Sequence, residues 1–435
     1  MPNWKNSFSN QSFFYITPDV KRGLGLENIL PHFHIICSYF DPLIPVLRKQ
    51  NANIFCLEEI DQNQKEVFNN SGKLLENPHV NNYIAKNSRG GTNVLLFKPS
   101  VKTELICEEM AYRLLVNSSH LNRKYENKIS FHELVAENFP QNAVPAVIGY
   151  LKNFRFGILV RQFGLPFIIQ FSLGWAGKTT FLIREENEFN ELINRFPDTP
   201  VKISKYIKGF TILNNACIYN GRILISPPAY QLSGFKELSS SPFVTCGRQW
   251  PAEFLANESR KLIFDLTNQV GKIMAIDGYK GYFGLDFIID EESGKVYISE
   301  NNARFTASSA FWTKMEIGRS ITPLMAYHIA HFTGVDLGLN YLNDGDICAS
   351  QVIFRDKNIQ PKNLEEVGFG VFTHFDNKWK LTKSEYKPEK LGTDEIIFMK
   401  RAQIISDDGE ISRVETKKEV VQTTDKLQDW VRELL

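Results

Sequence analysis

The stretch YFGLDFIIDEESGKVYISENNARFTAS, residues 282–308, brings acidic side chains to two neighbouring strands. Its apolar runs predict two strands joined at the DEESG turn, so Asp286 and Glu300 can approach each other across an antiparallel hairpin. Two like charges in that position repel unless a cation lies between them. Asn302, two residues beyond Glu300, lies on the same face and adds a neutral oxygen. This ligand set suits Mg²⁺ or Mn²⁺, and a solvated hairpin with scattered charges is the alternative.

Three other segments could bind a nucleotide. A glycine-rich turn, GWAGKT at 174–179, lies between two apolar segments, and its backbone N–H groups, Lys178 and Thr179 could bind phosphate. It is not a Walker loop, because it is too short and follows no strand-to-helix step. Lys128 precedes a predicted helix and could reach a phosphate, although a lone lysine there is ordinarily solvated. The segment SKYIKG is apolar and extended, so it is either a plain strand or one whose backbone pairs with an adenine edge.

In this order the four segments resemble the ATP-grasp superfamily. The resemblance spans about residues 92–330, and its most specific part is DFIID…VYISENNAR. It implies that Asp286, Glu300 and Asn302 bind the metal ion, and that Arg304 is the catalytic residue that holds a substrate carboxylate or acyl-phosphate. The residues that it implies for ATP binding are Lys128, Gln170, Gly174, Gly177, Lys178, Thr179, Lys205, Tyr206 and Ile207.

Two positions depart from the family's pattern. The family usually has a lysine at the end of the strand before the glycine loop, where this chain has Gln170. A glutamine donates a hydrogen bond but carries no charge, and Lys178 could supply that charge from the loop. After the hinge glycine, where the family often has a ribose-binding acid, the chain offers only Thr211.

The resemblance implies an enzyme, an ADP-forming ligase that makes a carbon–nitrogen bond. It would activate a carboxylate with ATP as an acyl-phosphate and join it to an amine, with Mg²⁺ or Mn²⁺ as cofactor. The alternatives are a nucleotide-binding regulatory protein without turnover and a ligase that acts on a protein or carrier acceptor. The sequence leaves open which small-molecule carboxylate and amine are used, and whether the protein forms a homodimer.

Composition narrows the class of protein. The chain has 435 residues, 43% of them hydrophobic and 23% charged, which predicts a globular protein of two or three domains. Its net charge of +1 gives no broad attraction to nucleic acid, and it lacks a long apolar span or a signal peptide, so we expect a cytoplasmic protein. The six cysteines form no C-x-x-C pair, and Cys246 is expected to be a buried, inert thiol.

The order of elements predicts an α/β and α+β protein. Residues 32–59 follow a strand–helix–strand pattern, so a doubly wound α/β layer similar to the family's pre-ATP-grasp domain should open the chain. The resemblance implies a two-lobed ATP-grasp fold after it and a C-terminal α+β extension. The expected domains are 1–120 (the α/β layer), 121–204 (the small lobe with the glycine loop), 205–345 (the large lobe with the metal site) and 346–435 (the extension).

Three segments are expected to lack regular structure. Residues 60–91 are rich in Asn, Ser and Gly and are predicted to be irregular. Residues 226–254 are predicted to be an irregular insertion, in which Arg248, Gln249 and Trp250 either contact substrate or belong to a packed surface loop. The charged residues 404–427 are expected to form a solvated face before the last helix.

Overall fold

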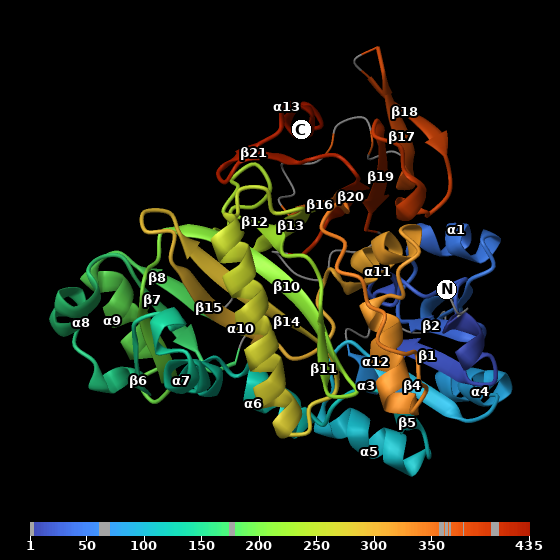
Figure 1. The fold of residues 1–435 in the computed structure, drawn as a ribbon, viewed down its shortest axis with the longest axis horizontal. Coiled ribbons are helices and arrows are strands. Elements are labelled where there is room, and N and C mark those ends of the chain that lie inside the picture. The colour runs from blue at the N-terminus through green and yellow to red at the C-terminus, as the bar shows by residue number, and fades with distance from the viewer. Residues whose placement is uncertain are drawn as a thin grey trace.

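The computed structural model describes residues 4–60, 70–173, 179–355, 361, 364, 367–376, 378–401 and 409–435. Their strands form a parallel sheet, a small antiparallel sheet and a long antiparallel sheet, besides a two-stranded ribbon. In Figure 1 the parallel sheet lies on one side of the molecule, the small sheet on the other side, and the long sheet between them. Among the described residues, no helix combines the length and the apolar character that crossing a membrane requires.

The parallel sheet opens the chain with the strand order β3-β2-β1-β4-β5. All five residues of β1 and of β2 are buried, as expected for central strands covered on both faces. The predicted α/β layer is thereby confirmed, but residues 60–91 are not wholly irregular, because α3 and α4 form there. The elements are β1 (Ser12–Ile16), β2 (Phe33–Cys37), α1 (Leu43–Lys49), β3 (Asn53–Cys56), α2 (Leu57–Ile60), α3 (Ser71–Glu76), α4 (Pro78–Asn87), β4 (Thr92–Leu96), α5 (Val101–Glu109) and β5 (Arg113–Leu114).

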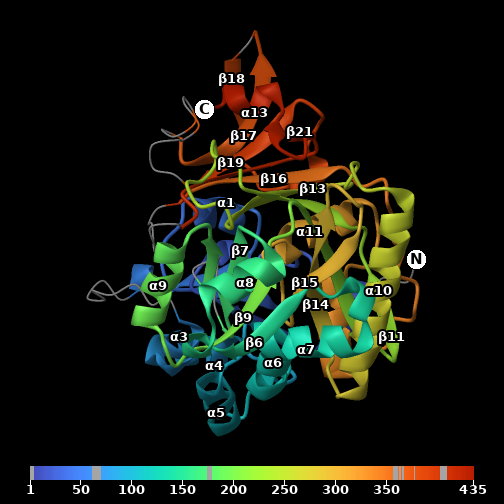
Figure 2. The same ribbon diagram turned by 90° about the vertical axis from the view of Figure 1, so that its left-hand side faces the viewer.

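The small antiparallel sheet has the order β6-β9-β7-β8. One face packs on its own apolar core, which includes Ile169, Val201 and Ile203, and helices α8 and α9 contribute to that core. Figure 2 views this unit from the front. Its elements are α6 (Ser119–Glu126), α7 (Lys128–Asn138), β6 (Ala146–Tyr150), α8 (Phe156–Phe163), β7 (Phe167–Phe171), β8 (Thr180–Ile183), α9 (Glu186–Arg195) and β9 (Pro200–Lys205).

The long sheet runs in the order β15-β14-β10-β12-β13-β16-β20-β19-β17-β18, with β11 paired to β10, and all its pairs are antiparallel. Strands from the end of the chain therefore continue the sheet that holds the 282–302 hairpin. The strands are β10 (Gly209–Tyr219), β11 (Arg222–Ile225), β12 (Ala229–Ser233), β13 (Thr245–Trp250), β14 (Gly281–Asp290), β15 (Val296–Asn302), β16 (Ala349–Phe354), β17 (Phe369–Phe375), β18 (Lys378–Lys383), β19 (Glu395–Lys400) and β20 (Ser412–Thr416). The other elements are α10 (Asn257–Ile276), α11 (Ser309–Gly318), α12 (Leu324–Thr333), α13 (Asp429–Glu433) and the ribbon β21 (Val421–Thr423) and β22 (Lys426–Leu427).

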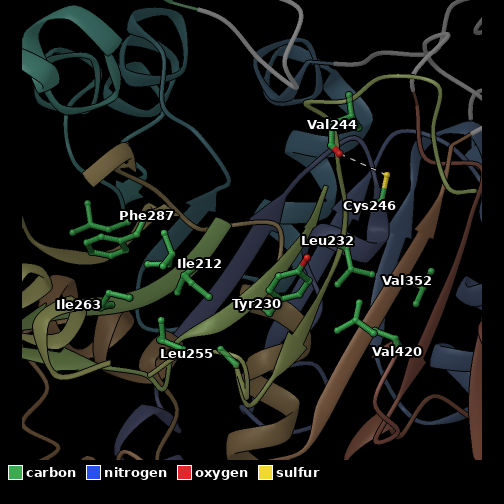
Figure 3. Packing of buried hydrophobic residues seen from close by; sticks show 14 of the residues in the cluster. Ile212, Tyr230, Leu232, Val244, Cys246, Leu255, Ile263, Phe287, Val352 and Val420 are labelled. Carbon is green, nitrogen blue, oxygen red and sulfur yellow. Dashed lines mark hydrogen bonds between the residues drawn. The ribbon is translucent and has the colours of Figure 1, made fainter. Parts of the chain in front are cut away.

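The two faces of the long sheet have different neighbours. Because side chains alternate along a strand, Ile212 and Phe287 point into the main apolar core, which helix α10 covers (Figure 3). The next residues, Leu213 and Asp286, are paired across β10 and β14 and lie on the opposite face. Cys246 belongs to the core side, and its Sγ–H donates to the Val244 carbonyl at 3.6 Å. Its burial raises the pKa of the thiol to about 11, as expected for an inert cysteine.

Two predictions about irregular segments were wrong. Residues 226–254 contain β12 and β13, and β13 lies inside the sheet rather than in a surface loop. Residues 412–416 form β20, a mostly buried strand between β16 and β19, instead of part of a solvated face. In both cases pairing with strands distant in sequence decides the structure, which local composition does not reveal.

Gly247 is a position where the sheet accepts only glycine, since its φ is +137° and a Cβ there would lie 1.9 Å from the Gln351 carbonyl oxygen. We expect Gly247→Ala to destabilise the protein by about 2–4 kcal/mol through backbone strain and overpacking. The matched control is Gly345→Ala, which has no neighbour within 4 Å and should change little. Denaturant midpoints of both variants measure the difference, and equal midpoints would contradict the expectation.

Candidate functional site

The 282–302 hairpin brings the three predicted metal ligands together. Asp286 on β14 is paired directly with Glu300 on β15, and a β-bulge follows at Phe287. Asn302, two residues further along β15, donates from Nδ2 to Asp286 Oδ2 at 3.2 Å. The two strands therefore hold two carboxylates and one amide on the same face of the sheet.

The carboxylates have unequal environments. Asp286 Oδ1 is buried and has no hydrogen-bond partner among the described residues. Burial and the nearby Glu300 charge raise the pKa of Asp286 to about 7. Burial also acts to raise the pKa of Glu300, but the ion pair with Lys128 outweighs it and lowers that pKa. Glu300 is thus compensated by an ion pair with a lysine. Asp286 forms no ion pair within the described residues, although the charges of Arg248 and Lys128 act to lower its pKa.

This donor set fits a hard divalent cation. A buried, unpartnered carboxylate oxygen beside a second carboxylate is the arrangement in which Mg²⁺ or Mn²⁺ replaces missing positive charge. In the described part of the chain there is no cluster of three or more His, Cys, Asp and Glu side chains that could hold a metal. Asp286, Glu300 and Asn302 would therefore leave most coordination positions to water or to phosphate oxygens, as Mg²⁺ prefers.

Lys128 connects this hairpin to the small sheet. It is the first residue of α7, which is capped by the Asn127 side chain, and its Nζ pairs with Glu300 Oε2. Its backbone N–H donates to the Ser172 carbonyl at 2.9 Å, just after β7 ends. The predicted residues Gly174, Gly177 and Lys178 lie outside the described residues. Thr179 lies at the start of the returning strand, where its carbonyl accepts from Phe171 N at 3.1 Å.

Lys202 is a site residue that the sequence analysis missed. It lies on β9 directly opposite Gln170 on β7, and Gln170 donates to Thr180 Oγ1 at 3.3 Å. Lys202 is 4% exposed, and no acid of the described chain lies within ion-pair distance of it. Burial and the nearby Lys128 lower its pKa to about 8. The signal was strand alternation in PVKISK, because Val201 and Ile203 enter the core and Lys202 must face the other way.

The three predicted hinge residues lie at the connection between β9 of the small sheet and β10 of the long sheet. Lys205 ends β9 and is exposed, and Tyr206 lies in the connection to β10. Ile207 is buried with Val144 and Tyr297 in a small apolar cluster formed by the two lobes. A flat apolar base would find suitable contacts at such a cluster.

Arg304 lies beside the three predicted metal ligands and forms several contacts. Its Nε contacts Glu126 Oε1 at 2.8 Å, its Nη2 donates to Asn302 Oδ1 at 2.9 Å, and its Nη1 donates to the Phe305 carbonyl at 3.1 Å. Its guanidinium also lies over the Phe97 ring, 4.9 Å from the centroid. A guanidinium has five N–H groups, so one N–H on each terminal nitrogen remains for a ligand.

Arg248, Gln249 and Trp250, which the sequence offered as candidate substrate contacts, lie on two different faces of β13. Gln249 faces the core, where its Oε1 accepts from the backbone of Val420 and Val421 at 2.7 and 3.0 Å. Trp250 stacks on Trp312 with 4.8 Å between centroids. Arg248 alternates with Gln249 and therefore lies on the same face of the sheet as Leu213 and Asp286.

Comparison with known proteins identifies the fold. No family model and no curated protein matches the sequence. The biotin carboxylase domain of Hydrogenobacter thermophilus 2-oxoglutarate carboxylase, solved with MgADP, ADP and bicarbonate, matches with a TM-score of 0.61 and 14% identity, over 93% of this chain and 86% of that chain. Staphylococcus aureus N5-carboxyaminoimidazole synthetase, solved with ADP, matches with a TM-score of 0.58 and 14% identity, over 93% and 92%. Campylobacter jejuni biotin carboxylase, in a β-γ-ATP complex, matches with a TM-score of 0.61 and 13% identity, over 95% and 89%. These matches confirm the fold that the resemblance implied.

The unpartnered Asp286 gives a test of metal binding. We expect millimolar Mg²⁺ to raise the thermal midpoint of the wild-type protein and to have no effect on Asp286→Asn. In EDTA, Asp286→Asn should be at least as stable as wild type, because the substitution removes repulsion of Glu300. Asp265→Asn, on the exposed side of α10, is the matched control and should respond like wild type. Equal Mg²⁺ responses in Asp286→Asn and wild type would show that Asp286 binds no cation.

Proposed function

We propose, from the ATP-grasp fold of the chain, that the protein is an ADP-forming ligase that activates a carboxylate with ATP and joins it to an amine. The observation that carries this proposal is the pair of opposed carboxylates, Asp286 and Glu300, with Lys128 and Lys202 beside them. Such a mixture of acids and lysines suits a metal-bound polyphosphate better than any other common ligand. Two of the neighbours with this fold, the 2-oxoglutarate carboxylase domain and the Staphylococcus aureus synthetase, were solved with ADP.

The reaction would proceed in two balanced steps. A carboxylate oxygen of the substrate attacks the γ-phosphorus of ATP, so that an acyl-phosphate forms and ADP leaves. An amine nitrogen then attacks the acyl carbon, phosphate leaves, and the nitrogen loses a proton. Phosphoryl transfer needs alignment and neutralised charge more than covalent assistance, which is what fixed basic side chains provide.

Each site residue has a role in this scheme. Lys128 and Lys202 would contact the phosphates, and Ile207 with its apolar neighbours would contact the base. Arg304, oriented by Glu126, would hold the reacting carboxylate through its remaining N–H groups. Asp286, Glu300 and Asn302 would hold Mg²⁺, which supplies charge neutralisation of the phosphate oxygens when bound.

The finer assignments belong to the same proposal. Gln170 would hydrogen-bond a phosphate, Lys205 and Tyr206 would present backbone groups to adenine, and residues 174–179 would cover the phosphates. The domain division at residues 120, 204 and 345 and a cytoplasmic location are proposed as well. The substrates would be a small-molecule carboxylate and an amine.

The proposal predicts carboxylate-dependent ADP release. With MgATP and pools of amino acids, dipeptides and other carboxylates, one pool should stimulate release of ADP and phosphate, and addition of an amine should raise the rate. The rate of ADP release by Glu300→Gln should fall about 100-fold or more, because the substitution removes an acid beside the transferred phosphoryl group. The exposed Glu258→Gln at the start of α10 is the control and should behave like wild type.

The outcomes separate the alternatives. ATP binding without turnover on any pool would point to a macromolecular acceptor or to a regulatory protein. Absence of nucleotide binding would refute the proposed function altogether.

Lys202 supports a second prediction. We expect Lys202→Met to weaken MgATP binding about 10- to 100-fold, as loss of a charge-assisted contact of about 1.5–3 kcal/mol implies. Since Gln170 lies directly opposite, the double variant Lys202→Met/Gln170→Lys should recover part of that affinity. Lys152→Met, an exposed lysine of the same lobe, is the control. Titration with a fluorescent ATP analogue measures all four proteins, and unchanged affinity in Lys202→Met would exclude a phosphate contact.

A further inference from the structure

We propose that Arg248 binds a non-reacting carboxylate of the carboxylate substrate, in a subsite separate from the phosphates of the nucleotide and from the reacting carboxylate that Arg304 would hold. The inference rests on the proposed function and names the substrate class of the same site.

Arg248 lies on the face of the long sheet that also carries Asp286. On β13 it is paired with Gln231 of β12 and with Gln351 of β16, and all three side chains share one face. That face continues across β12 and β10 to Asp286 on β14. Three strand spacings of about 4.8 Å separate β13 from β14, or about 14 Å. A side chain of arginine length covers part of this distance, which leaves room for a small molecule between the two residues.

The guanidinium of Arg248 lacks a counterion. Arg248 is 5% exposed, so a small part of it still borders solvent, yet its Nε and Nη1 have no hydrogen-bond partner. Within the described residues, no carboxylate lies within 4 Å of it, since it takes part in no ion pair there. Its burial lowers the pKa of the guanidinium to about 10, which reflects the same uncompensated charge.

The nearby acids Glu415 and Glu410 already interact with other side chains. Glu415, opposite Gln351, accepts from Gln351 Nε2 at 2.7 Å and from the Tyr386 hydroxyl at 3.1 Å, and lies 3.5 Å from Arg413 Nη1. Glu410 forms a two-point ion pair with Arg413. Both acids are therefore occupied by partners other than Arg248. Gln351, its direct neighbour, is neutral.

Asp286 is the acid whose charge most favours the Arg248 cation, whereas Arg413 and Arg355 oppose it. Asp286 is also the proposed metal ligand, so a bound cation would take up its charge. The charges of Arg413 and Arg355, which disfavour the Arg248 cation, would then remain. A buried charge without a partner is destabilising, and a methionine would fill the same space without that penalty.

A carboxylate is the kind of anion that would compensate the charge of Arg248. The planar guanidinium presents parallel N–H groups that match the two oxygens of a carboxylate. The phosphates already have Lys128 and Lys202 on the side of the small lobe, whereas β13 lies on the other side of β10 and β12 from the hairpin. An anion at Arg248 would therefore belong to the carboxylate substrate and lie beyond the nucleotide.

The test compares Arg248→Met and Arg248→Lys with Arg222→Met, an exposed control on β11. MgADP titration should give a Kd for Arg248→Met within about twofold of wild type. With the carboxylate pool that stimulates ADP release, Arg248→Met should raise the KM for the carboxylate at least tenfold, and Arg248→Lys should raise it less. Arg248→Met should also be at least as stable as wild type without ligand, because it removes an unpaired buried charge.

Four results would overturn the proposal. Loss of MgADP binding in Arg248→Met alone would assign the arginine to the nucleotide, and an unchanged carboxylate KM would remove it from substrate binding. A clearly lower thermal midpoint would make it a structural residue. If wild type binds no nucleotide, the proposed function fails, and the subsite is tested by itself. Acetate, succinate and citrate, at ionic strength matched with chloride, should then raise the thermal midpoint of wild type and leave that of Arg248→Met unchanged; no difference between the two would refute the carboxylate subsite.

Discussion

The repulsion between Asp286 and Glu300 is the interaction on which the site depends. The two acids are directly paired across β14 and β15, where like charges are unfavourable. Glu300 is compensated by Lys128, which comes from the first turn of α7. Asp286 keeps one oxygen buried without a partner. The hairpin therefore depends on positive charge from outside itself, which Lys128 supplies to Glu300 and which Arg248 and Lys128 supply to Asp286 through longer-range attraction.

This dependence joins the two lobes through charge. Lys128 reaches across to Glu300, and Arg304, just after β15, reaches back to Glu126 at the end of α6. The two ion pairs cross the same boundary in opposite directions, so the hairpin and the α6–α7 segment hold each other. Lys202 lies next to this boundary with its charge opposed by Lys128. An anion bound between the two lysines would relieve that repulsion.

Much of the site could be predicted from local sequence, and the remainder could not. Asp286, Glu300 and Asn302 lie on two strands joined by a short turn, so alternation and one hairpin suffice to bring them together. Alternation in PVKISK indicates that Lys202 faces away from the core, but its position opposite Gln170 required the pairing of β7 with β9, which are separated by a loop, a strand and a helix. Arg248 required β13 to enter the sheet between β12 and a strand about 100 residues later in the chain. Long-range pairing is decided by packing of the whole sheet, which no short window of sequence contains.

The C-terminal strands extend the part of the sheet that holds Arg248. Strand β16 pairs with β13, and β20 and β19 follow, so Gln351 and Glu415 continue the row of side chains that begins at Arg248. Glu415 is held by Gln351, Tyr386 and Arg413. The backbone N–H of Tyr386 in turn donates to Gln50 Oε1 of the first layer at 3.0 Å. A second link, the ion pair of Arg401 with Asp19, also joins these strands to the first layer. Since these three contacts engage both oxygens of Glu415, that acid already has partners other than Arg248, and the C-terminal strands leave the charge of Arg248 uncompensated.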